Sequence, residues 1–167
     1  MKYCPDCGNI LEAKWIDGAE RYVCVHDDCQ FVHWNNPVPV VAALVSHAGK
    51  FVIARNAKWP KGIFSVITGY LEQNEQPEQA VLREVKEELG LDGEIKRFIG
   101  NYVFTAKNQV ILCYEVEATG QLQINHELAE FKLLSTEELI AYNFAPLKIT
   151  ENIISDWKKL NKPPQDQ

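Results

Sequence analysis

The residues best suited to chemistry lie in one glutamate-rich stretch, "GYLEQNEQPEQAVLREVKEELGL", which ends at Leu91. Glu84, Glu87 and Glu88 fall at i, i+3 and i+4, so a helix would carry all three on one face. Like charges at this spacing repel by roughly 0.2–0.5 kcal/mol per pair, and the negative end of the helix dipole adds to that cost. A solvated acidic face is one interpretation. The other is a site for Mg²⁺ or Mn²⁺, because these ions prefer hard oxygen ligands.

The same stretch carries the signals of a helix with defined ends. Pro77 suits the first turn, where its missing N–H is no loss, and Gly90 suits the position just after the last turn. Asn74 or Glu75 is expected to accept hydrogen bonds from the free amides at the start. Apolar residues recur every four positions on the face away from the glutamates: Val81, Val85 and Leu89.

The spacing within this stretch resembles the Nudix box of the Nudix hydrolase family at every fixed position. The matching positions are Gly69, Glu75, Arg83, Glu84, Val85, Glu87, Glu88, Gly90 and Leu91. The resemblance extends over most of residues 38–145 and implies an α/β/α sandwich with a mixed sheet. It also implies hydrolysis of a nucleoside diphosphate linked to a further group X.

By this resemblance, Glu84 and Glu88 would be the principal ligands of a catalytic Mg²⁺ or Mn²⁺, and Glu87 a weaker or second-metal ligand. The backbone carbonyl of Gly69 would complete the site. Arg83 would orient a glutamate through a charge-assisted hydrogen bond. The metals would neutralise the pyrophosphate and activate a water, so that two phosphate monoesters leave.

Acidic residues on either side of the helix complete this comparison. Glu75 would stabilise the loop that leads into the helix. A glutamate outside the box often acts in the family as the general base or as an extra ligand, and "INHELAEFKLLSTEEL" resembles the strand-to-helix segment that carries it. Glu127 is the first candidate and Glu130 the second. The alternative for each is an ordinary loop charge.

Four of the five cysteines fall within the first 29 residues, as two pairs: Cys4 and Cys7, then Cys24 and Cys29. Four thiolates suit a tetrahedral Zn²⁺, and "CPDCG" is typical of a zinc-ribbon knuckle. Because the second pair is more widely spaced, His26 or His33 is an alternative ligand. A redox pair or unrelated thiols are the remaining interpretations. The fifth cysteine, Cys113, lies in an apolar run and is expected in the core.

A zinc ribbon followed by a Nudix domain resembles the NADH pyrophosphatase branch of the family, and so does "FSVITGYLE". The branch's downstream "SQPWPFP"-like motif is absent, and "NYVFTAKNQVILCYE" stands in its place. ADP-ribose or a flavin dinucleotide therefore fits as well as NADH. The expected partner is a small nucleotide. Candidate substrate residues near the box are Phe64, Tyr70 and Lys61, with packing or solvated charge as the alternative.

Two rival functions use the same features differently. A regulator could bind nucleic acid through the zinc ribbon and keep the Nudix fold for ligand sensing. The net charge of −6 disfavours broad nucleic-acid binding, which depends on basic side chains that neutralise phosphates. The intact glutamates disfavour a regulator as well. The second rival is a pyrophosphatase that removes damaged nucleoside triphosphates.

The composition and residue pattern of the chain predict its division into domains. The chain has 167 residues, 46% hydrophobic and 24% charged, without an apolar run of about 20 residues or the apolar core of a signal peptide. A cytoplasmic protein without a membrane span is expected, with a homodimer suggested by the family resemblance. The expected parts are a zinc ribbon over 1–36, a Nudix domain over 37–161 and a disordered tail over 162–167.

The expected order of elements in the second domain is β-β-β-α-β-β-α-α. Runs rich in β-branched residues predict strands, and "HAGK" between the first two predicts a hairpin. Ser135 and Glu138 are in capping-box register for a short helix, and a final helix is expected from Thr150. The predicted strands cover residues 38–46, 50–56, 63–70, 94–106 and 109–118.

Overall fold

The structure is a computed structural model that describes residues 1–161, and the chain divides after Pro37 into two compact units. The first unit is a small antiparallel sheet. Its strands are β1 (Leu11–Ile16), β2 (Ala19–Cys24) and β3 (Val32–His33). Its buried residues are few and gather around the cysteines: Cys4, Leu11 and Cys24, with Cys29 and Phe31 packed against them.

The second unit begins at Val38 and contains a six-stranded sheet in the order β7-β8-β4-β5-β9, with β6 paired to β4. Its strands are β4 (Val38–His47), β5 (Lys50–Asn56), β6 (Ile67–Tyr70), β7 (Asp92–Phe104), β8 (Gln109–Thr119) and β9 (Leu128–Leu134). The β4–β8 pair is parallel and the other pairs are antiparallel, so the sheet is mixed as predicted.

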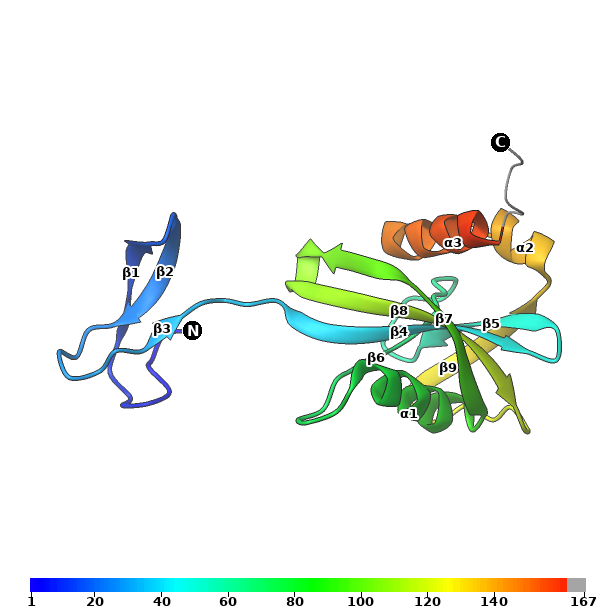
Figure 1. Cartoon of the computed structure of the whole chain (residues 1–167), viewed down its shortest axis with the longest axis horizontal. Coiled ribbons are helices and arrows are strands. Elements are labelled where there is room, and N and C mark those ends of the chain that lie inside the picture. Colours follow the sequence, from blue (N-terminus) through cyan, green and yellow to red (C-terminus); the bar gives the residue numbers. More distant parts are fainter. Residues whose placement is uncertain (162–167) are drawn as a thin grey trace. The chain divides into compact units, whose positions relative to one another are not determined.

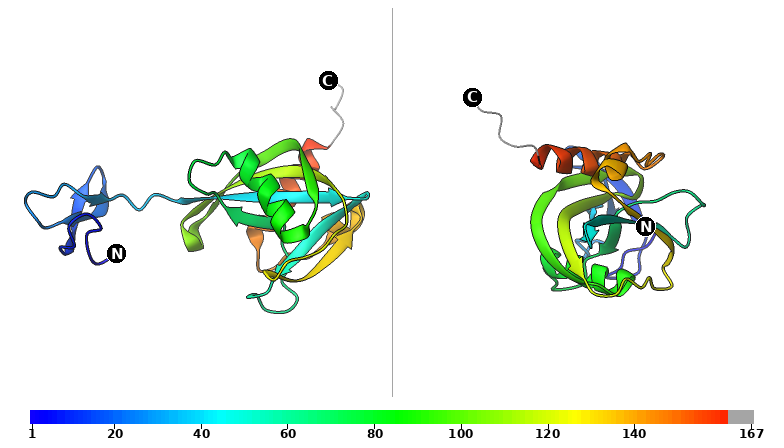
Figure 2. Two further views of the ribbon diagram at one scale, coloured as in Figure 1. Left: turned by 90° about the horizontal axis from the view of Figure 1, so that it is seen from below. Right: turned by 90° about the vertical axis from the view of Figure 1, so that its right-hand side faces the viewer.

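Helices cover both faces of this sheet, which confirms the α/β/α sandwich. The helices are α1 (Pro77–Leu89), α2 (Thr136–Ala141) and α3 (Lys148–Leu160), with a short 3₁₀ turn over Thr105–Lys107. Side chains alternate along β4, so Val41 packs in the core beneath α1 whereas Leu44 packs in the core beneath α2 and α3. Figures 1 and 2 show α1 on one side of the sheet and α3 on the other.

Most predicted elements are present, but some boundaries differ and one strand was not in the predicted order. The hairpin of β4 and β5 and the capping box of Ser135 are confirmed; the Glu138 amide donates to the Ser135 Oγ at 3.2 Å. The third strand is shorter than predicted, and α3 begins two residues earlier, at Lys148. The predicted order of elements lacked β9, because most of its residues are exposed and give no clear alternation, although the family resemblance indicated a strand-to-helix segment there.

The start of α1 also differs from the prediction. The N-cap is Gln76, whose amide donates to the Gln79 side chain at 3.2 Å, so neither Asn74 nor Glu75 caps the helix. The C-terminal prediction is confirmed: Gly90 has a φ of 71°, a conformation that glycine adopts without strain. The predicted tail at 162–167 lies outside the described residues. None of the helices in residues 1–161 is both long and apolar enough to span a membrane.

Candidate functional site

Arg83 is the centre of the acidic edge of α1. Its Nε and Nη2 donate to the two carboxylate oxygens of Glu75, at 2.8 and 3.0 Å. Its Nη1 donates to Glu84 at 2.8 Å and to Glu87 at 3.0 Å, and Nη2 also reaches the carbonyl oxygen of Tyr70 at 3.0 Å. One guanidinium therefore fixes the loop before α1 and two of the three clustered carboxylates.

The bidentate pair between Arg83 and Glu75 is electrostatically strong. The hydrogen bonds from Arg83 lower the pKa of the Glu75 carboxyl to about 2. The same contact raises the pKa of Arg83. Lys86, which shares the helix, points away from this edge and pairs with Asp92 at 2.7 Å. The Glu75 contact thus stabilises the loop–helix junction.

Glu88 has a different environment from its neighbours. Its side chain is buried at 5% exposure, and within residues 1–161 it forms no ion pair with a basic side chain. Burial, followed by the charges of Glu84, Glu127 and Glu87, raises the pKa of Glu88 to about 8. Burial also raises the pKa of Glu84, against the opposing effect of Arg83. The protein therefore holds a proton at Glu88 at neutral pH unless another cation replaces it.

This pKa predicts that stability falls with rising pH. Between pH 4.5, the ordinary value for glutamate, and about 8, folded Glu88 keeps a proton that the unfolded chain releases. The contribution is complete below pH 4.5 and is lost as the pH rises through about 8, with a slope of at most about 1.4 kcal/mol per pH unit. Urea unfolding at several pH values, without added Mg²⁺ or Mn²⁺, measures it. Glu88→Gln should flatten the slope, and an unchanged slope would contradict the assignment.

Gly69 allows the chain to pass directly against Glu84. A Cβ atom built on Gly69 would lie 1.9 Å from Cδ and 2.1 Å from Oε1 of Glu84, closer than real atoms approach. Gly69 pairs with Val41 in the β4–β6 ladder, so its backbone cannot shift without breaking that pairing. The glycine thus sets the position of the Glu84 carboxylate against the backbone of β6.

Gly69→Ala is accordingly expected to displace the Glu84 carboxylate and to lower turnover by about tenfold or more, while most of the fold is kept. Steady-state kinetics and the thermal midpoint would measure the two effects. The matched control is Gly49→Ala, in the β4–β5 turn, where a Cβ meets no atom within 4 Å. Its positive φ costs stability but leaves Glu84 untouched. Equal turnover in both variants would contradict the steric argument.

Glu127 lies on the segment that connects β8 to β9, and this segment is hydrogen-bonded to the end of α1. The Asn125 amide donates to the Glu88 carbonyl at 3.1 Å, and the Ala57 amide donates to the Glu127 carbonyl at 2.7 Å. The charge of Glu127 contributes to the raised pKa of both Glu84 and Glu88. The second candidate, Glu130, is instead engaged by Arg55. Of the two, the structure brings Glu127 to the cluster.

The three candidate substrate residues lie in different surroundings. Phe64 is buried at 3% exposure in the core beneath α2 and α3, on the other side of the sheet from α1. Tyr70 is 56% exposed, and its hydroxyl accepts a hydrogen bond from Gln109 at 3.0 Å. Lys61 is exposed. The structure therefore leaves Tyr70 and Lys61 accessible and encloses Phe64.

A narrow recess opens directly against Glu88. It is lined by Ala54, Asn56, Trp59, Val66, Ile67, Thr68, Glu88 and Leu128. Asn56 and Thr68 are polar residues that the sequence-based prediction missed. They come from different strands, and no spacing in the sequence connects them with the glutamates. Trp59 adds an aromatic side chain to the wall.

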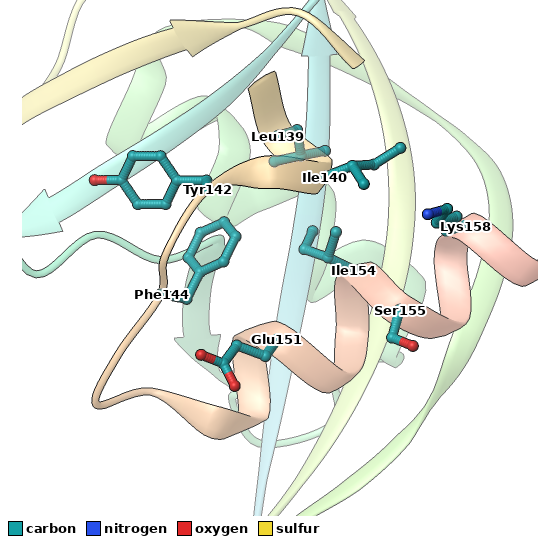
Figure 3. A pocket seen from close by; sticks show the side chains of 8 residues that line it. All are labelled: Leu139, Ile140, Tyr142, Phe144, Glu151, Ile154, Ser155 and Lys158. Atoms are coloured by element: carbon teal, nitrogen blue, oxygen red, sulfur yellow. The ribbon is translucent and has the colours of Figure 1, made fainter. Parts of the chain in front are cut away.

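A larger recess, of about 230 Å³, lies between α2 and α3 and is shown in Figure 3. Its floor is apolar, with Leu139, Phe144 and Ile154 from the core beneath α2 and α3. Glu151 and Lys158 are the charged residues of its lining. Since α1 packs on the opposite face of the sheet, this recess does not contain the clustered glutamates.

The first unit brings the four predicted cysteines together. Their sulfur atoms all lie within 4.8 Å of one another, with 3.7 Å between Cys4 and Cys29 and 3.4 Å between Cys7 and Cys24. Zinc–sulfur bonds of about 2.3 Å in a tetrahedron require a similar separation. A hydrogen bond from the Asn9 side chain helps to lower the pKa of Cys7 to about 6, whereas burial and the neighbouring thiols raise the pKa of Cys24 and of Cys29 against the lowering effect of backbone hydrogen bonds. The donor set fits Zn²⁺.

Neither histidine that served as an alternative ligand belongs to this cluster. The Nδ1 of His26 instead accepts a hydrogen bond from the Asp28 amide at 3.3 Å. His33 lies on β3, opposite Tyr22. The fifth cysteine, Cys113, is fully buried in the core of the second unit, as predicted.

Comparisons with known proteins agree with this architecture. The NUDIX domain family matches residues 36–156. A solved structure of a NUDIX hydrolase from Nitrosomonas europaea superposes with a TM-score of 0.82 at 23% identity, covering 96% of this chain and 92% of that chain. The likeness extends over the first unit as well as the second.

Two named relatives align at moderate identity. The chain is 27% identical over 171 residues to the NAD-capped RNA hydrolase NudC of Vibrio atlanticus (strain LGP32), covering 99% of this chain and 62% of the relative. It is 29% identical over 133 residues to the NAD(P)H pyrophosphatase NUDT13, mitochondrial, of Homo sapiens, covering 78% of this chain and 37% of the relative. The chain therefore spans less than two-thirds of the length of either.

Proposed function

Because the chain belongs to the NUDIX domain family, we propose that it is a Mg²⁺- or Mn²⁺-dependent pyrophosphohydrolase. Its substrate would be a nucleoside diphosphate linked to a group X, and its products two phosphate monoesters. The observation that carries this proposal is the state of Glu88: a buried carboxylate without a basic partner in residues 1–161, surrounded by further carboxylates. A divalent cation bound by several carboxylate oxygens would neutralise such a group of charges.

Each residue of the cluster has a distinct part in this proposal. Glu84 and Glu88 would hold the metal, with Glu87 and the Gly69 carbonyl as further ligands. The bound metal would supply charge neutralisation for the pyrophosphate and an acidified water. Arg83 would keep Glu84 and Glu87 oriented from the side of the helix. In this arrangement, no basic side chain within residues 1–161 forms an ion pair with Glu88 itself.

Glu127 would act as the general base or as an additional ligand. Its backbone is held by Ala57, whereas its side chain forms no hydrogen bond within residues 1–161. A carboxylate that is near the cluster and not engaged by a cation can take the proton of an attacking water at its oxygen. Glu130 lacks this freedom because Arg55 engages it.

For the substrate, we propose a dinucleotide or nucleotide sugar such as ADP-ribose, NADH or an FAD-like dinucleotide. The named relatives support this class, since both are named for a nicotinamide nucleotide. An NAD cap on RNA is a further candidate because the Vibrio relative is named for it. The net charge of −6 favours recognition of the cap over recognition of a long RNA body.

One screen tests the proposal. ADP-ribose, NADH, FAD, NAD-capped RNA and nucleoside triphosphates are incubated with Mg²⁺ or Mn²⁺, and the products are identified by mass. Two monophosphates support the proposal, whereas pyrophosphate from a triphosphate supports the sanitising alternative. The absence of cleavage, together with a gel shift of nucleic acid at physiological salt, would support the alternative of a regulator that binds nucleic acid through the zinc ribbon.

The cysteine cluster would hold a structural Zn²⁺ rather than a catalytic one. All four positions of a tetrahedron are filled by protein sulfur, so no position remains for substrate. A reducing compartment such as the cytoplasm fits four thiols that must stay reduced. Zinc would therefore stabilise the first unit without entering the reaction.

A further inference from the structure

Strand β9 forms one edge of the six-stranded sheet, and within residues 1–161 it pairs only with β5. Five consecutive residues of this strand are exposed, from Ala129 to Leu133. A bulge beside Asn56 leaves Ala129 out of the ladder, but the pairing from Glu130 to Leu134 is regular. An edge strand of this kind presents unpaired N–H and C=O groups and can pair with another chain.

The opposite edge, β7, is protected against such pairing. Its ladder with β8 has two irregularities, one before Arg97 and one before Gly100. Bulges bend an edge strand and interrupt its row of hydrogen-bonding groups. The Arg97 side chain also extends to the end of α3, where it donates to the Leu160 carbonyl at 3.3 Å and to the Asn161 side chain at 3.0 Å. The open edge of the sheet is therefore β9.

Hydrogen bonds of β5 show which backbone groups of β9 point outward. Ala54 and Ser65 exchange two hydrogen bonds of 2.9 Å, so the amide and the carbonyl of Ala54 both point away from β9. Phe131, which lies opposite Ala54, is therefore in a non-hydrogen-bonded pair, and its own amide and carbonyl point to the free edge. Because this direction alternates along a strand, Leu133 points its backbone groups outward as well.

The side chains of β9 differ between its two faces. Phe131 and Leu133 lie opposite residues of the core beneath α1, and each is 39% exposed. Glu130 and Lys132 lie on the other face, toward α2 and α3. The edge thus carries two apolar side chains on one face and two opposite charges on the other.

We propose that β9 pairs with β9 of a second copy of the chain, antiparallel and about a two-fold axis at Phe131. In this register, Phe131 exchanges both of its outward backbone hydrogen bonds with Phe131 of the second copy. Leu133 then lies opposite Ala129 of the second copy, and the axis repeats each contact twice. The two Phe131 rings form an aromatic cross-strand pair, which favours the pairing of the strands.

The charges select this register over its neighbours. With Phe131 on the axis, Glu130 of each copy lies directly opposite Lys132 of the other, in non-hydrogen-bonded pairs, where side chains are closest. An axis at Glu130 would set two glutamates face to face, and an axis at Lys132 would set two lysines face to face. Like charges directly opposite disfavour pairing. A lysine on an edge strand normally discourages contact with other chains, but here it meets an opposite charge.

Both charged side chains keep the capacity for this contact. Arg55, which is 11% exposed, contacts Oε1 of Glu130 and donates to the Trp59 carbonyl at 2.9 Å. The Glu130 side chain is still 47% exposed, so its other carboxylate oxygen can accept from the second copy. The Lys132 ammonium donates to the Tyr142 hydroxyl at 3.2 Å and has two further protons to donate.

The test measures association of the full chain, with Zn²⁺ present, by sedimentation at a series of concentrations. Because one short strand pair is small beside the interface of a permanent dimer, the unchanged protein should dissociate on dilution. Lys132→Glu and Glu130→Lys should each raise the dissociation constant by about tenfold or more, since each sets like charges face to face. An equimolar mixture of the two variants should associate again, because every charged pair between them is attractive.

Phe131→Asp is the second test, and it leaves the contact of Arg55 with Glu130 intact. It puts two carboxylates on the axis and should weaken the homodimer by about the same factor. The matched control is Lys96→Glu, which reverses the charge of an exposed lysine on the other edge strand, β7. It should leave the dissociation constant within about twofold of that of the unchanged protein. Thermal unfolding of each variant shows whether the fold is kept.

Three results would overturn the inference: a chain that stays monomeric at millimolar concentration, a mixture of the two charge variants that does not associate, or equal effects of Lys96→Glu and Lys132→Glu. The association assay requires no turnover, so its outcome is independent of the proposed function. Association without hydrolysis would leave this inference standing, whereas hydrolysis by a chain that stays monomeric would overturn this inference alone.

Discussion

Replacement of Glu88 or Glu84 by glutamine is expected to lower turnover by about a hundredfold or more. Each change removes a proposed metal ligand while it keeps the shape of the side chain. Glu88→Gln also removes a buried ionisable group, so its fold should be at least as stable as that of the unchanged protein at pH 8. Steady-state kinetics at saturating Mg²⁺, with circular dichroism for the fold, measure both effects.

Glu117→Gln is the control for these variants. Glu117 also lies in the second unit, but its side chain is 55% exposed and pairs with Lys96, so its loss should change turnover little. Magnesium binding, measured by calorimetry, should weaken in the two site variants and not in the control. Near-normal rates in both Glu84→Gln and Glu88→Gln would remove the metal mechanism.

Removal of zinc is expected to unfold the first unit. Residues 1–37 have a buried cluster of only three residues, two of which are cysteines, so little apolar burial opposes the loss of chain entropy. The free energy of zinc binding would then be the main source of stability in this unit. Treatment with a strong chelator should make the segment before Val38 sensitive to protease, while the second unit resists digestion.

Cys24→Ser should reproduce the effect of the chelator, together with a loss of bound zinc measured by elemental analysis. Cys113→Ala is the matched control, since this cysteine is buried in the second unit, away from the cluster. It should retain zinc and the protease resistance of the first 37 residues. Continued resistance of that segment in the zinc-free protein would show that its sheet needs no metal.

Local spacing was enough to predict the parts of the site that one short segment carries. The i, i+3 and i+4 pattern placed Glu84, Glu87 and Glu88 on one edge of α1, because helix geometry alone fixes that relation. The apolar face followed from the same periodicity, and the helix end at Gly90 followed from the preference of glycine for that position. The two cysteine pairs likewise predicted the zinc site, because a four-thiolate site needs only two short segments that each carry two cysteines.

Contacts between segments could not be predicted in this way. Both Glu127 and Glu130 were plausible in the sequence, and the difference between them comes from Arg55, which lies on another strand. Phe64 is close to Gly69 along the chain, yet it is buried in the core on the opposite side of the sheet from α1. The residue pattern alone did not predict β9, because its pairing with β5, rather than its own side chains, makes it a strand.

By itself, then, the sequence determined which residues can carry charge or bind metal and which helix or knuckle presents them, since those relations depend on a few neighbouring positions. Only the tertiary structure decided that Glu88 is buried without a basic partner, that Gly69 lies against Glu84, and that Arg55 connects β9 to the Trp59 loop. The physical reason is that burial and ion pairing depend on which distant segments the sheet brings together. No spacing along the chain encodes them directly.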